Sequence, residues 1–279
     1  MSRTPSEPKL IGVRRTAELL DRYAVVPRKR LGQNFIVDPN TIRMIVGHAH
    51  LGREDRVLEI GAGAGALTVA IAGLVRHVTA IEIDERLRPV LQDVVGGLAN
   101  VDVVIGDALV VDLPTLDATR MMGNLPYSVA PDVILRVLKR APGIRDLTVM
   151  VQKEVGDRLT ARHGETLYGK TCLEVRYFAR TDVVGKVSRR AFLPVPHVDS
   201  VVVRVERRME QPSVGGDLFL RLVTAAFSQR RKTMKNALAS SDFGGRDLEA
   251  ALKSAGIDKE ARPQNVSFDQ FIDLAGHLE

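Results

Sequence analysis

The chain has 279 residues, 45% of them hydrophobic, and its 40 lysines and arginines exceed its 34 acidic residues to give a net charge of +6. It contains no apolar run of the roughly eighteen residues that span a membrane, and its polar N-terminus lacks the apolar core of a secretory signal. The single cysteine excludes an internal disulfide, and no cysteine–histidine spacing resembles a zinc site. These features predict a cytoplasmic protein without a metal, long enough for one larger and one smaller domain.

The N-terminal part is expected to begin with a leader over residues 1–26, partly disordered, with a short helix at 16–23. A basic stretch, PRKRLG at 27–32, then leads into the segment QNFI at 33–36. Asp38 followed by Pro39 predicts the start of a helix, because an aspartate side chain accepts from the first free N–H groups and proline suits the first turn.

Short apolar runs alternate with helical patterns from residue 56 onwards. The predicted strands cover 56–60, 78–83, 101–105, 120–123, 147–152, 182–187 and 201–206. The predicted helices cover 65–75, 85–95, 130–140, 154–162 and 168–178. This alternation is typical of an α/β fold with a doubly wound, mainly parallel sheet, here of seven strands. The last two strands predict a closing hairpin with one antiparallel member.

The C-terminal part has a different pattern. The segment QPSVGG at 211–216 reads as a linker, and the residues after it carry helical spacing only. We therefore expect an α/β domain over 27–211 and a small all-helical domain over 212–279.

A glycine-rich turn follows the strand at 56–60. Gly61 and Gly63 leave little side chain there, so the backbone can approach a ligand closely at the carboxyl edge of the sheet. Glu82, near the end of the next strand, is placed to accept both hydroxyls of a ribose. The turn also fits a loose dinucleotide fingerprint or a tight turn that binds nothing. By itself it does not decide between a nicotinamide dinucleotide and another adenosine cofactor.

Two further strand ends carry polar residues. Asp107 follows the third strand, where its carboxylate could accept from an adenine amino group or simply cap the next segment.

The fourth strand ends in GNLPY at 123–127, in which Pro126 stiffens the turn and keeps Leu125 out of the helical region. The amide oxygen of Asn124 and the carbonyl of Leu125 could accept both N–H bonds of an exocyclic amine. Tyr127 could stack on the ring of the same base. The alternative is a plain turn with a half-buried tyrosine.

Basic residues gather in four short clusters. They are Arg28-Lys29-Arg30, Arg189-Arg190, Arg207-Arg208 and Arg230-Arg231-Lys232. Any one cluster could be a solvated face, but four of them favour a polyanionic partner such as nucleic acid.

These motifs together resemble a known family. GNLPY, preceded by EIGAGAG, Glu82 and Asp107, resembles the N/D-P-P-Y/F pattern of amino-group DNA and RNA methyltransferases. The segments RKRLGQNF, FLPVPHVDS (192–200) and FSQRRKTMKNAL (227–238) narrow the resemblance to the bacterial small-subunit (16S) ribosomal RNA adenine N6-dimethyltransferases. One departure is Ala62, where that family usually has proline. Alanine in place of proline should slightly alter the rigidity of the turn, and it removes no hydrogen-bond donor or acceptor.

The resemblance implies a Rossmann-like class I methyltransferase domain that uses S-adenosyl-L-methionine. The cofactor positions it implies are Asn34, Ile36, Gly61, Gly63, Glu82, Asp107 and Asn124. The catalytic turn it implies is Asn124, Leu125, Pro126 and Tyr127. The substrate-binding positions are Tyr127, with Phe192 as a second stacking ring, and Arg230, Arg231 and Lys232 for the RNA.

The implied reaction is dimethylation of the N6 amines of two adjacent adenosines in the 3′-terminal hairpin loop of 16S rRNA. The implied partner is this RNA within the 30S subunit or its precursor, bound by a monomer with a role in ribosome biogenesis. The alternative is a 23S rRNA adenine N6-methyltransferase of the macrolide-resistance type. That group shares the QNF segment but typically has isoleucine at the position of Leu125, and it usually lacks the full SQRRK block.

Overall fold

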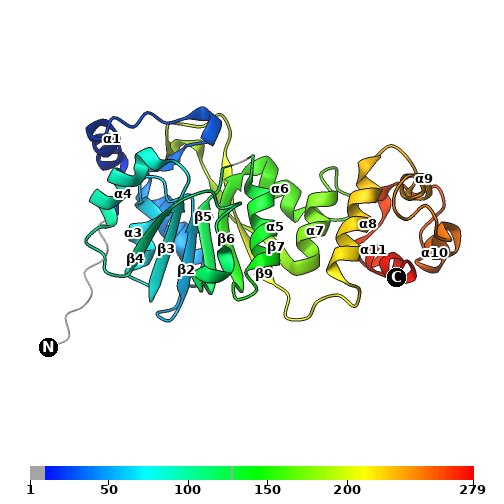
Figure 1. Ribbon diagram of the computed structural model, residues 1–279. Coiled ribbons are helices and arrows are strands. Elements are labelled where there is room, and N and C mark those ends of the chain that lie inside the picture. Colours follow the sequence, from blue (N-terminus) through cyan, green and yellow to red (C-terminus); the bar gives the residue numbers. More distant parts are fainter. Residues whose placement is uncertain (1–9, 127) are drawn as a thin grey trace. The chain divides into compact units, whose positions relative to one another are not determined.

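The computed structural model describes residues 10–126 and 128–279 (Figure 1). The chain divides into two compact units. The first consists of Met1–Gly156 and Thr181–Arg207, and the second of Asp157–Arg180 and Arg208–Glu279. The second unit therefore contains residues 212–279, which we expected to be helical, and in addition the stretch Asp157–Arg180.

A seven-stranded sheet forms the centre of the first unit. Its strands are β2 (Arg56–Ile60), β3 (His77–Glu82), β4 (Val101–Ile105), β5 (Arg120–Asn124), β6 (Asp146–Gln152), β7 (Ala179–Val187) and β9 (Ser200–Arg207). Their order is β4-β3-β2-β5-β6-β9-β7. The pairs from β4 to β6 are parallel, and β9 pairs with β6 in the antiparallel sense. The predicted doubly wound, mainly parallel sheet is confirmed, with its switch point between β2 and β5.

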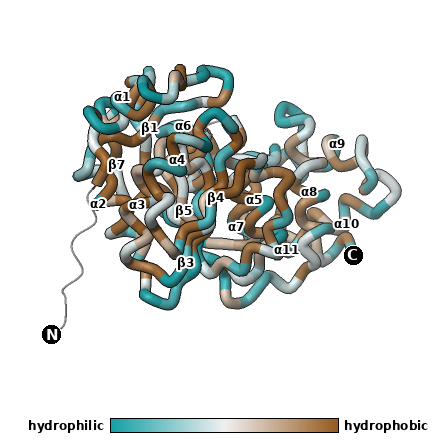
Figure 2. The backbone as a smooth tube through the Cα atoms, turned by 60° about the vertical axis from the view of Figure 1, so that its left-hand side comes forward, coloured by the Kyte–Doolittle hydropathy of each residue, from teal (hydrophilic) through white to brown (hydrophobic). Residues whose placement is uncertain are grey.

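Helices accompany the strands as the alternation predicted. They are α2 (Pro39–His48), α3 (Ala66–Ala72), α4 (Arg88–Val95), α5 (Ala130–Arg140) and α6 (Lys153–Thr160). Local signals explain where they begin: the Asp38 side chain accepts from the N–H groups of Asn40 and Thr41 at the start of α2. The strands run as hydrophobic segments between hydrophilic loops, because a parallel sheet is covered on both faces (Figure 2).

The described part of the expected leader is folded. Helix α1 (Val13–Arg22) is held against α4 by Asp93, which accepts from Arg22 at 2.8 Å and from the Tyr23 hydroxyl at 3.0 Å. Leu19 of α1 is fully buried in a cluster that also contains Phe35. The expected disorder falls on residues 1–9, which lie outside the described residues.

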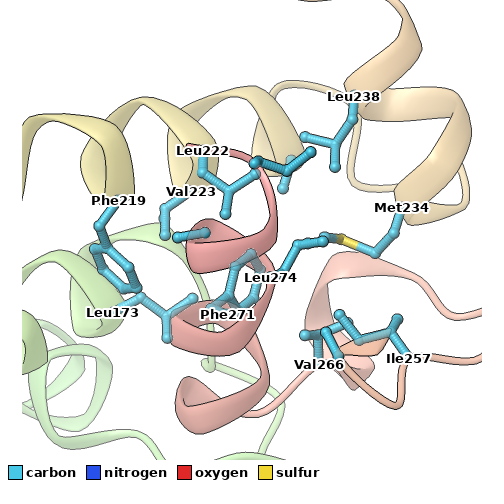
Figure 3. Packing of buried hydrophobic residues seen from close by; sticks show 14 of the residues in the cluster. Leu173, Phe219, Leu222, Val223, Met234, Leu238, Ile257, Val266, Phe271 and Leu274 are labelled. Atoms are coloured by element: carbon cyan, nitrogen blue, oxygen red, sulfur yellow. The ribbon is translucent and has the colours of Figure 1, made fainter. Parts of the chain in front are cut away.

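The second unit is built from helices around one apolar core. These are α7 (Lys170–Phe178), α8 (Gly216–Ser228), α9 (Met234–Ala239), α10 (Leu248–Ser254) and α11 (Phe268–His277). Figure 3 shows Phe219 and Leu222 of α8 facing Phe271 and Leu274 of α11, all of them buried. Leu173 of α7 joins the same cluster, which explains why residues 157–180 belong to this unit.

Candidate active site

A pocket opens at the carboxyl ends of β2, β3, β4 and β5. Its walls include Gly61, Glu82, Asp107 and Asn124, one polar or glycine position from each of these strand ends. Open α/β sheets bind ligands at this edge, next to the point where the strand order reverses. The four positions are far apart in the sequence, and the parallel sheet brings them together.

The glycine turn has a geometry that other residues fit poorly. Gly61 and Gly63 have φ of +83° and +58°, in the left-handed region. A Cβ atom on Gly61 would lie 2.9 Å from the carbonyl oxygen of Asn124, and one on Gly63 would lie 3.0 Å from Cδ1 of Phe35. The turn is therefore packed tightly against β5 and against Phe35, which is buried.

Glu82 is held in place before any ligand arrives. One carboxylate oxygen accepts from the Gly63 N–H at 2.8 Å and the other from the Asp84 N–H at 2.9 Å. The side chain is buried, and burial raises its pKa while these two N–H groups oppose the shift. A carboxylate offers about four acceptor positions, so two remain for hydroxyl groups in the pocket.

Asp107 caps the segment after β4 and keeps one oxygen free. One of its oxygens accepts from the Leu109 N–H at 2.8 Å and so caps the turn after β4. No described residue donates to its second oxygen, and the residue lines the pocket. That second oxygen is the one available to an amino group.

The turn after β5 carries two oxygens without donors. The amide nitrogen of Asn124 donates to the carbonyl of Asn34 at 2.8 Å, and this bond fixes the amide so that its oxygen points the other way. Leu125 is anchored by its N–H, which donates to the Met150 carbonyl at 3.0 Å. Within the described ranges, nothing donates to the Asn124 amide oxygen or the Leu125 carbonyl. Pro126 accepts from Ala130 and so starts α5, and Tyr127 lies outside the described residues.

The QNF segment forms one wall of the pocket through a feature that the sequence did not predict. Strand β1 (Phe35–Ile36) pairs with β8 (Phe192–Leu193) in a two-stranded antiparallel sheet. Gln33 donates to Asp84 at 2.8 Å, and Asp84 also accepts twice from Arg86, at 2.5 and 2.9 Å. Arg86 and Gln33 together hold the pKa of Asp84 low, at about 2. Asp84 therefore connects the QNF segment to the strand end that carries Glu82. In the sequence, only its position two residues after Glu82 could have pointed to this role.

Phe192 does not present a free face. Its ring is 2% exposed and packs in the core together with Ile36 and Ile42. The pairing of Phe192 with Ile36 in the β1–β8 sheet places it there. The expected role of Phe192 as a second stacking ring stays a prediction, and a base would reach this ring only after the packing around it had opened.

The basic clusters differ in how free their charges are. The Arg207 guanidinium donates to the carbonyls of Leu138, Ala141 and Ile144 at 2.8–3.1 Å and to Val137 at 3.5 Å. Burial lowers the pKa of Arg207. It closes the C-terminal end of α5, where carbonyls lack helical partners. The pair Arg207-Arg208 is therefore structural, because Arg208 donates to the Arg176 carbonyl at 2.8 Å and covers Phe268.

The three residues of the fourth cluster, Arg230-Arg231-Lys232, differ in their contacts. Arg230 donates to the Tyr168 carbonyl at 3.3 Å, with its guanidinium carbon 5.8 Å from the centre of the Phe227 ring. Arg231 and Lys232 are exposed, and neither has a side-chain partner in the part of the chain that the structure describes. All three side chains are exposed, and Arg231 and Lys232 are the two without such a contact among the described residues.

The charge of the pocket wall is one-sided. Glu59, Glu82 and Asp107 line it, and no lysine, arginine or histidine does so among the described residues. The pocket is thus suited to a ligand with hydroxyl and amino groups and a positive charge.

The described residues contain no cluster of acidic, histidine or cysteine side chains suited to a metal. Over the same ranges, no helix is long and apolar enough to cross a membrane.

Comparisons with known proteins agree with this geometry. Residues 26–279 match the family described as ribosomal RNA adenine dimethylase. The "Ribosomal RNA small subunit methyltransferase A" of Thermobifida fusca is 41% identical over 95% of this chain and 94% of its own length. That of Anoxybacillus flavithermus is 38% identical over the same shares of the two chains.

Solved structures show the same fold. A dimethyladenosine transferase from Plasmodium falciparum superposes with a TM-score of 0.73 at 25% identity, covering 85% of this chain and 94% of that one. The 23S rRNA methyltransferase ErmE gives 0.68 at 31% identity, with 88% and 99% covered. The chain belongs to the ribosomal RNA adenine dimethylase family.

Proposed function

We propose that this protein uses S-adenosylmethionine to dimethylate the N6 amines of two adjacent adenosines in the 3′-terminal hairpin loop of 16S rRNA. The observation that carries the proposal is the set of unused acceptors at the strand ends. Glu82, Asp107 and Asn124 each keep acceptor capacity after their local hydrogen bonds are counted. They lie in one pocket without a cationic side chain among its described residues.

The residues present fit the cofactor. Glu82 would accept from the ribose hydroxyls and Asp107 from the adenine amino group. The turn at Gly61 and Gly63 would let the backbone come close to the ligand, and Asn34 and Ile36 would close the opposite wall. When bound, S-adenosylmethionine supplies an electrophilic methyl group on a positively charged sulfur.

The charge of the pocket favours this cofactor over a nicotinamide dinucleotide. A dinucleotide brings an anionic pyrophosphate, which would face Glu82 and Asp107 without a compensating cation among the described lining residues. Sites for such anions use free N–H groups or basic side chains. The acidic wall disfavours the oxidoreductase that the glycine turn alone would allow.

Asn124 and Leu125 would act on the target amine. The Asn124 amide oxygen and the Leu125 carbonyl would each accept one N–H and hold the amine nitrogen with its lone pair towards the methyl group. Both oxygens would stabilise positive charge as it develops on that nitrogen. A general base is not needed, since the methylated nitrogen is strongly acidic and loses its proton to water.

The small-subunit substrate is favoured over the large-subunit one. Relatives 38–41% identical over 95% of this chain are named small-subunit methyltransferases, and the chain carries the full SQRRK block. The similarity to the 23S enzyme ErmE is lower, at 31%. We expect a monomer that acts in the cytoplasm on 16S rRNA within the 30S subunit, as a step of ribosome biogenesis.

The direct test is tritium transfer from S-adenosylmethionine to purified 30S subunits, followed by nucleoside analysis. Labelled N6,N6-dimethyladenosine supports the proposal. RNA binding without any transfer would instead indicate a non-catalytic assembly factor. Quenching or enhancement of reduced nicotinamide fluorescence by the protein would indicate the oxidoreductase.

The proposed stacking role of Tyr127 has its own test. Tyr127→Ala would remove the stacking ring, worth roughly 1–3 kcal/mol per base, while Tyr127→Phe keeps the ring and removes only the hydroxyl. We expect the phenylalanine variant to keep most of its methylation of 30S subunits and the alanine variant to lose it. Equal damage by both would show that the hydroxyl matters and the stacking role is wrong.

A further inference from the structure

Glu59 is a buried acid in the pocket wall for which the mechanism above has no use. It is 0% exposed, and neither carboxyl oxygen has a hydrogen-bond partner among the described residues. Side chains alternate along a strand, so Glu59 of β2 points to the same side as Val57. Val57 clusters with Leu67 and Ile71 of α3. The carboxyl group therefore lies between the sheet and α3, where the pocket wall is formed.

The groups that face Glu59 are uncharged or negative. Its neighbours in register are Ala80 on β3 and Met122 on β5. From α3 it meets the hydroxyl of Thr68, which is also buried and has no hydrogen-bond partner among the described residues. The charge that acts on it is that of Glu82, at the end of β3. Burial raises the pKa of Glu59 to about 8, the Thr68 hydroxyl opposes this shift, and the Glu82 charge adds to it.

Glu59 and Glu82 differ in what supports a negative charge. Glu82 has a backbone N–H donor on each oxygen, at 2.8 and 2.9 Å, so its carboxylate is compensated. Glu59 has only the Thr68 hydroxyl as a nearby donor, without a formed hydrogen bond, and no lysine, arginine or histidine among the described pocket residues, so a buried carboxylate there is strongly unfavourable. In the empty pocket, the proton therefore resides on Glu59 and the charge on Glu82.

We propose that Glu59 is a specificity-determining residue that distinguishes the cofactor, with its sulfonium charge, from the product, which lacks that charge. This inference rests on the proposed use of S-adenosylmethionine. With the pocket empty, Glu59 is a neutral acid. When the cation binds, the O–H bond of Glu59 breaks, the proton passes to solvent, and the carboxylate remains to attract the positive charge.

The same group would weaken the hold on the product. The ammonium and carboxylate are common to both ligands, and S-adenosylhomocysteine lacks only the sulfonium charge, so an ionised Glu59 loses that compensation once the methyl group has left. Glu59 then takes a proton back from solvent and returns to its neutral form. The preference for cofactor over product comes from this change of charge, without any contact to the methyl group being required.

The test is calorimetric titration of the full-length protein in two buffers of different ionisation enthalpy, which counts the protons released on binding. The ligands are S-adenosylmethionine, S-adenosylhomocysteine and sinefungin, whose amine places a positive charge where the cofactor has its sulfonium. At pH 7 we expect about 0.4–0.9 proton released with either cation, because binding next to a cation lowers the pKa of an acid by about 1–3 units from its value of about 8. With S-adenosylhomocysteine we expect close to none.

Glu59→Gln is the decisive variant, and Thr68→Val is its matched control. The glutamine is neutral and similar in shape, so it should bind S-adenosylmethionine about tenfold more weakly while S-adenosylhomocysteine changes less than about twofold. It should also abolish the difference in proton release between the ligands. Thr68→Val leaves the acid in place and should retain that difference.

The pH dependence of stability provides a second readout without any ligand. Unfolded Glu59 ionises near its ordinary value of 4.5, and folded Glu59 near 8. The folded state thus binds the extra proton between these values, and the stability of the wild type falls as pH rises through this window. Glu59→Gln removes this loss, so its advantage in unfolding temperature should grow from pH 5 to pH 8.

Three results would overturn the inference. Equal proton release with S-adenosylmethionine and S-adenosylhomocysteine, or a difference that persists in Glu59→Gln, would show that another group titrates. A pH-independent stability difference would show that Glu59 is ionised in the folded state. If none of the three ligands binds, the proposed function itself fails, and this outcome is distinct from binding without differential proton release.

Discussion

The strand-end pocket and the arginine clusters use their polar groups in opposite ways. In the pocket, local backbone bonds orient Glu82, Asp107 and Asn124 and leave at least one acceptor position on each side chain unused. At Arg207 the whole guanidinium is directed to carbonyls of its own chain, and none of the carboxylates in the described residues pairs with it.

The difference shows which polar groups are available for function. A side chain that is partly bonded is both oriented and free to bind, as preorganised sites require. A guanidinium whose N–H groups are all bonded to carbonyls stabilises the fold, and its charge is not available to a partner. Variants at the two kinds of position should therefore fail in different assays.

The largest effect is expected at Asn124. Asn124→Ala removes one of the two acceptors for the target amine, which should lower the turnover of 30S methylation by about two to three orders of magnitude. Single-turnover formation of dimethyladenosine measures this. Asn40→Ala, at an exposed asparagine on α2, is the control and should be close to wild type. A loss below about fivefold for Asn124→Ala would remove the amide from the mechanism.

The next effect concerns the cofactor. Glu82→Ala leaves the ribose hydroxyls and the Gly63 N–H without their acceptor, which should weaken S-adenosylmethionine binding by roughly 1–3 kcal/mol. Calorimetry gives the affinity. Glu85→Ala is the control three residues away, since the Glu85 side chain is 80% exposed. Unchanged affinity in Glu82→Ala would place the ribose elsewhere.

Arg207 tests the other side of the comparison. Arg207→Ala deprives the carbonyls at the end of α5 of their donor and should lower the free energy of unfolding by about 1–3 kcal/mol. Urea unfolding measures it, with Arg231→Ala expected within about 0.5 kcal/mol of wild type. If both variants are equally stable, Arg207 is not structural and the contrast drawn above is wrong.

The smallest effect is expected for the free cations. Arg231→Ala combined with Lys232→Ala should reduce the slope of log affinity against log salt for RNA by about 1.5, because each phosphate contact contributes about 0.7–0.9. Filter binding to 16S rRNA at several salt concentrations measures this. Lys235→Ala, whose ammonium pairs with Glu249, is the control. An unaltered slope would make Arg231 and Lys232 part of a solvated face.

The sequence predicted the strand-end residues because parallel strands end at one edge of the sheet. Glu82, Asp107 and Asn124 could therefore be brought together by counting strands. The same reasoning did not reveal that Phe192 is buried, because a two-residue strand such as β8 has no periodicity that would show its pairing with β1.

Other features had no signal in the sequence. The partners of Arg207 are backbone carbonyls, which every residue possesses, so a structural arginine and an RNA-binding one look alike. The apolar face of α7 predicted a helix but not which core it joins, and Leu173 places it in the helical unit. The missing donors around Glu59 likewise depend on packing between β2 and α3.

The central claim is that this site methylates adenosine in small-subunit rRNA. Its most direct test mixes equal amounts of unmethylated 30S and 50S subunits with labelled S-adenosylmethionine and analyses the nucleosides of each RNA by mass spectrometry. We predict that N6,N6-dimethyladenosine appears in 16S rRNA alone, at two positions in its 3′-terminal hairpin, and is lost with Asn124→Ala. Label in 23S rRNA, or on a nucleoside other than adenosine, would contradict the account.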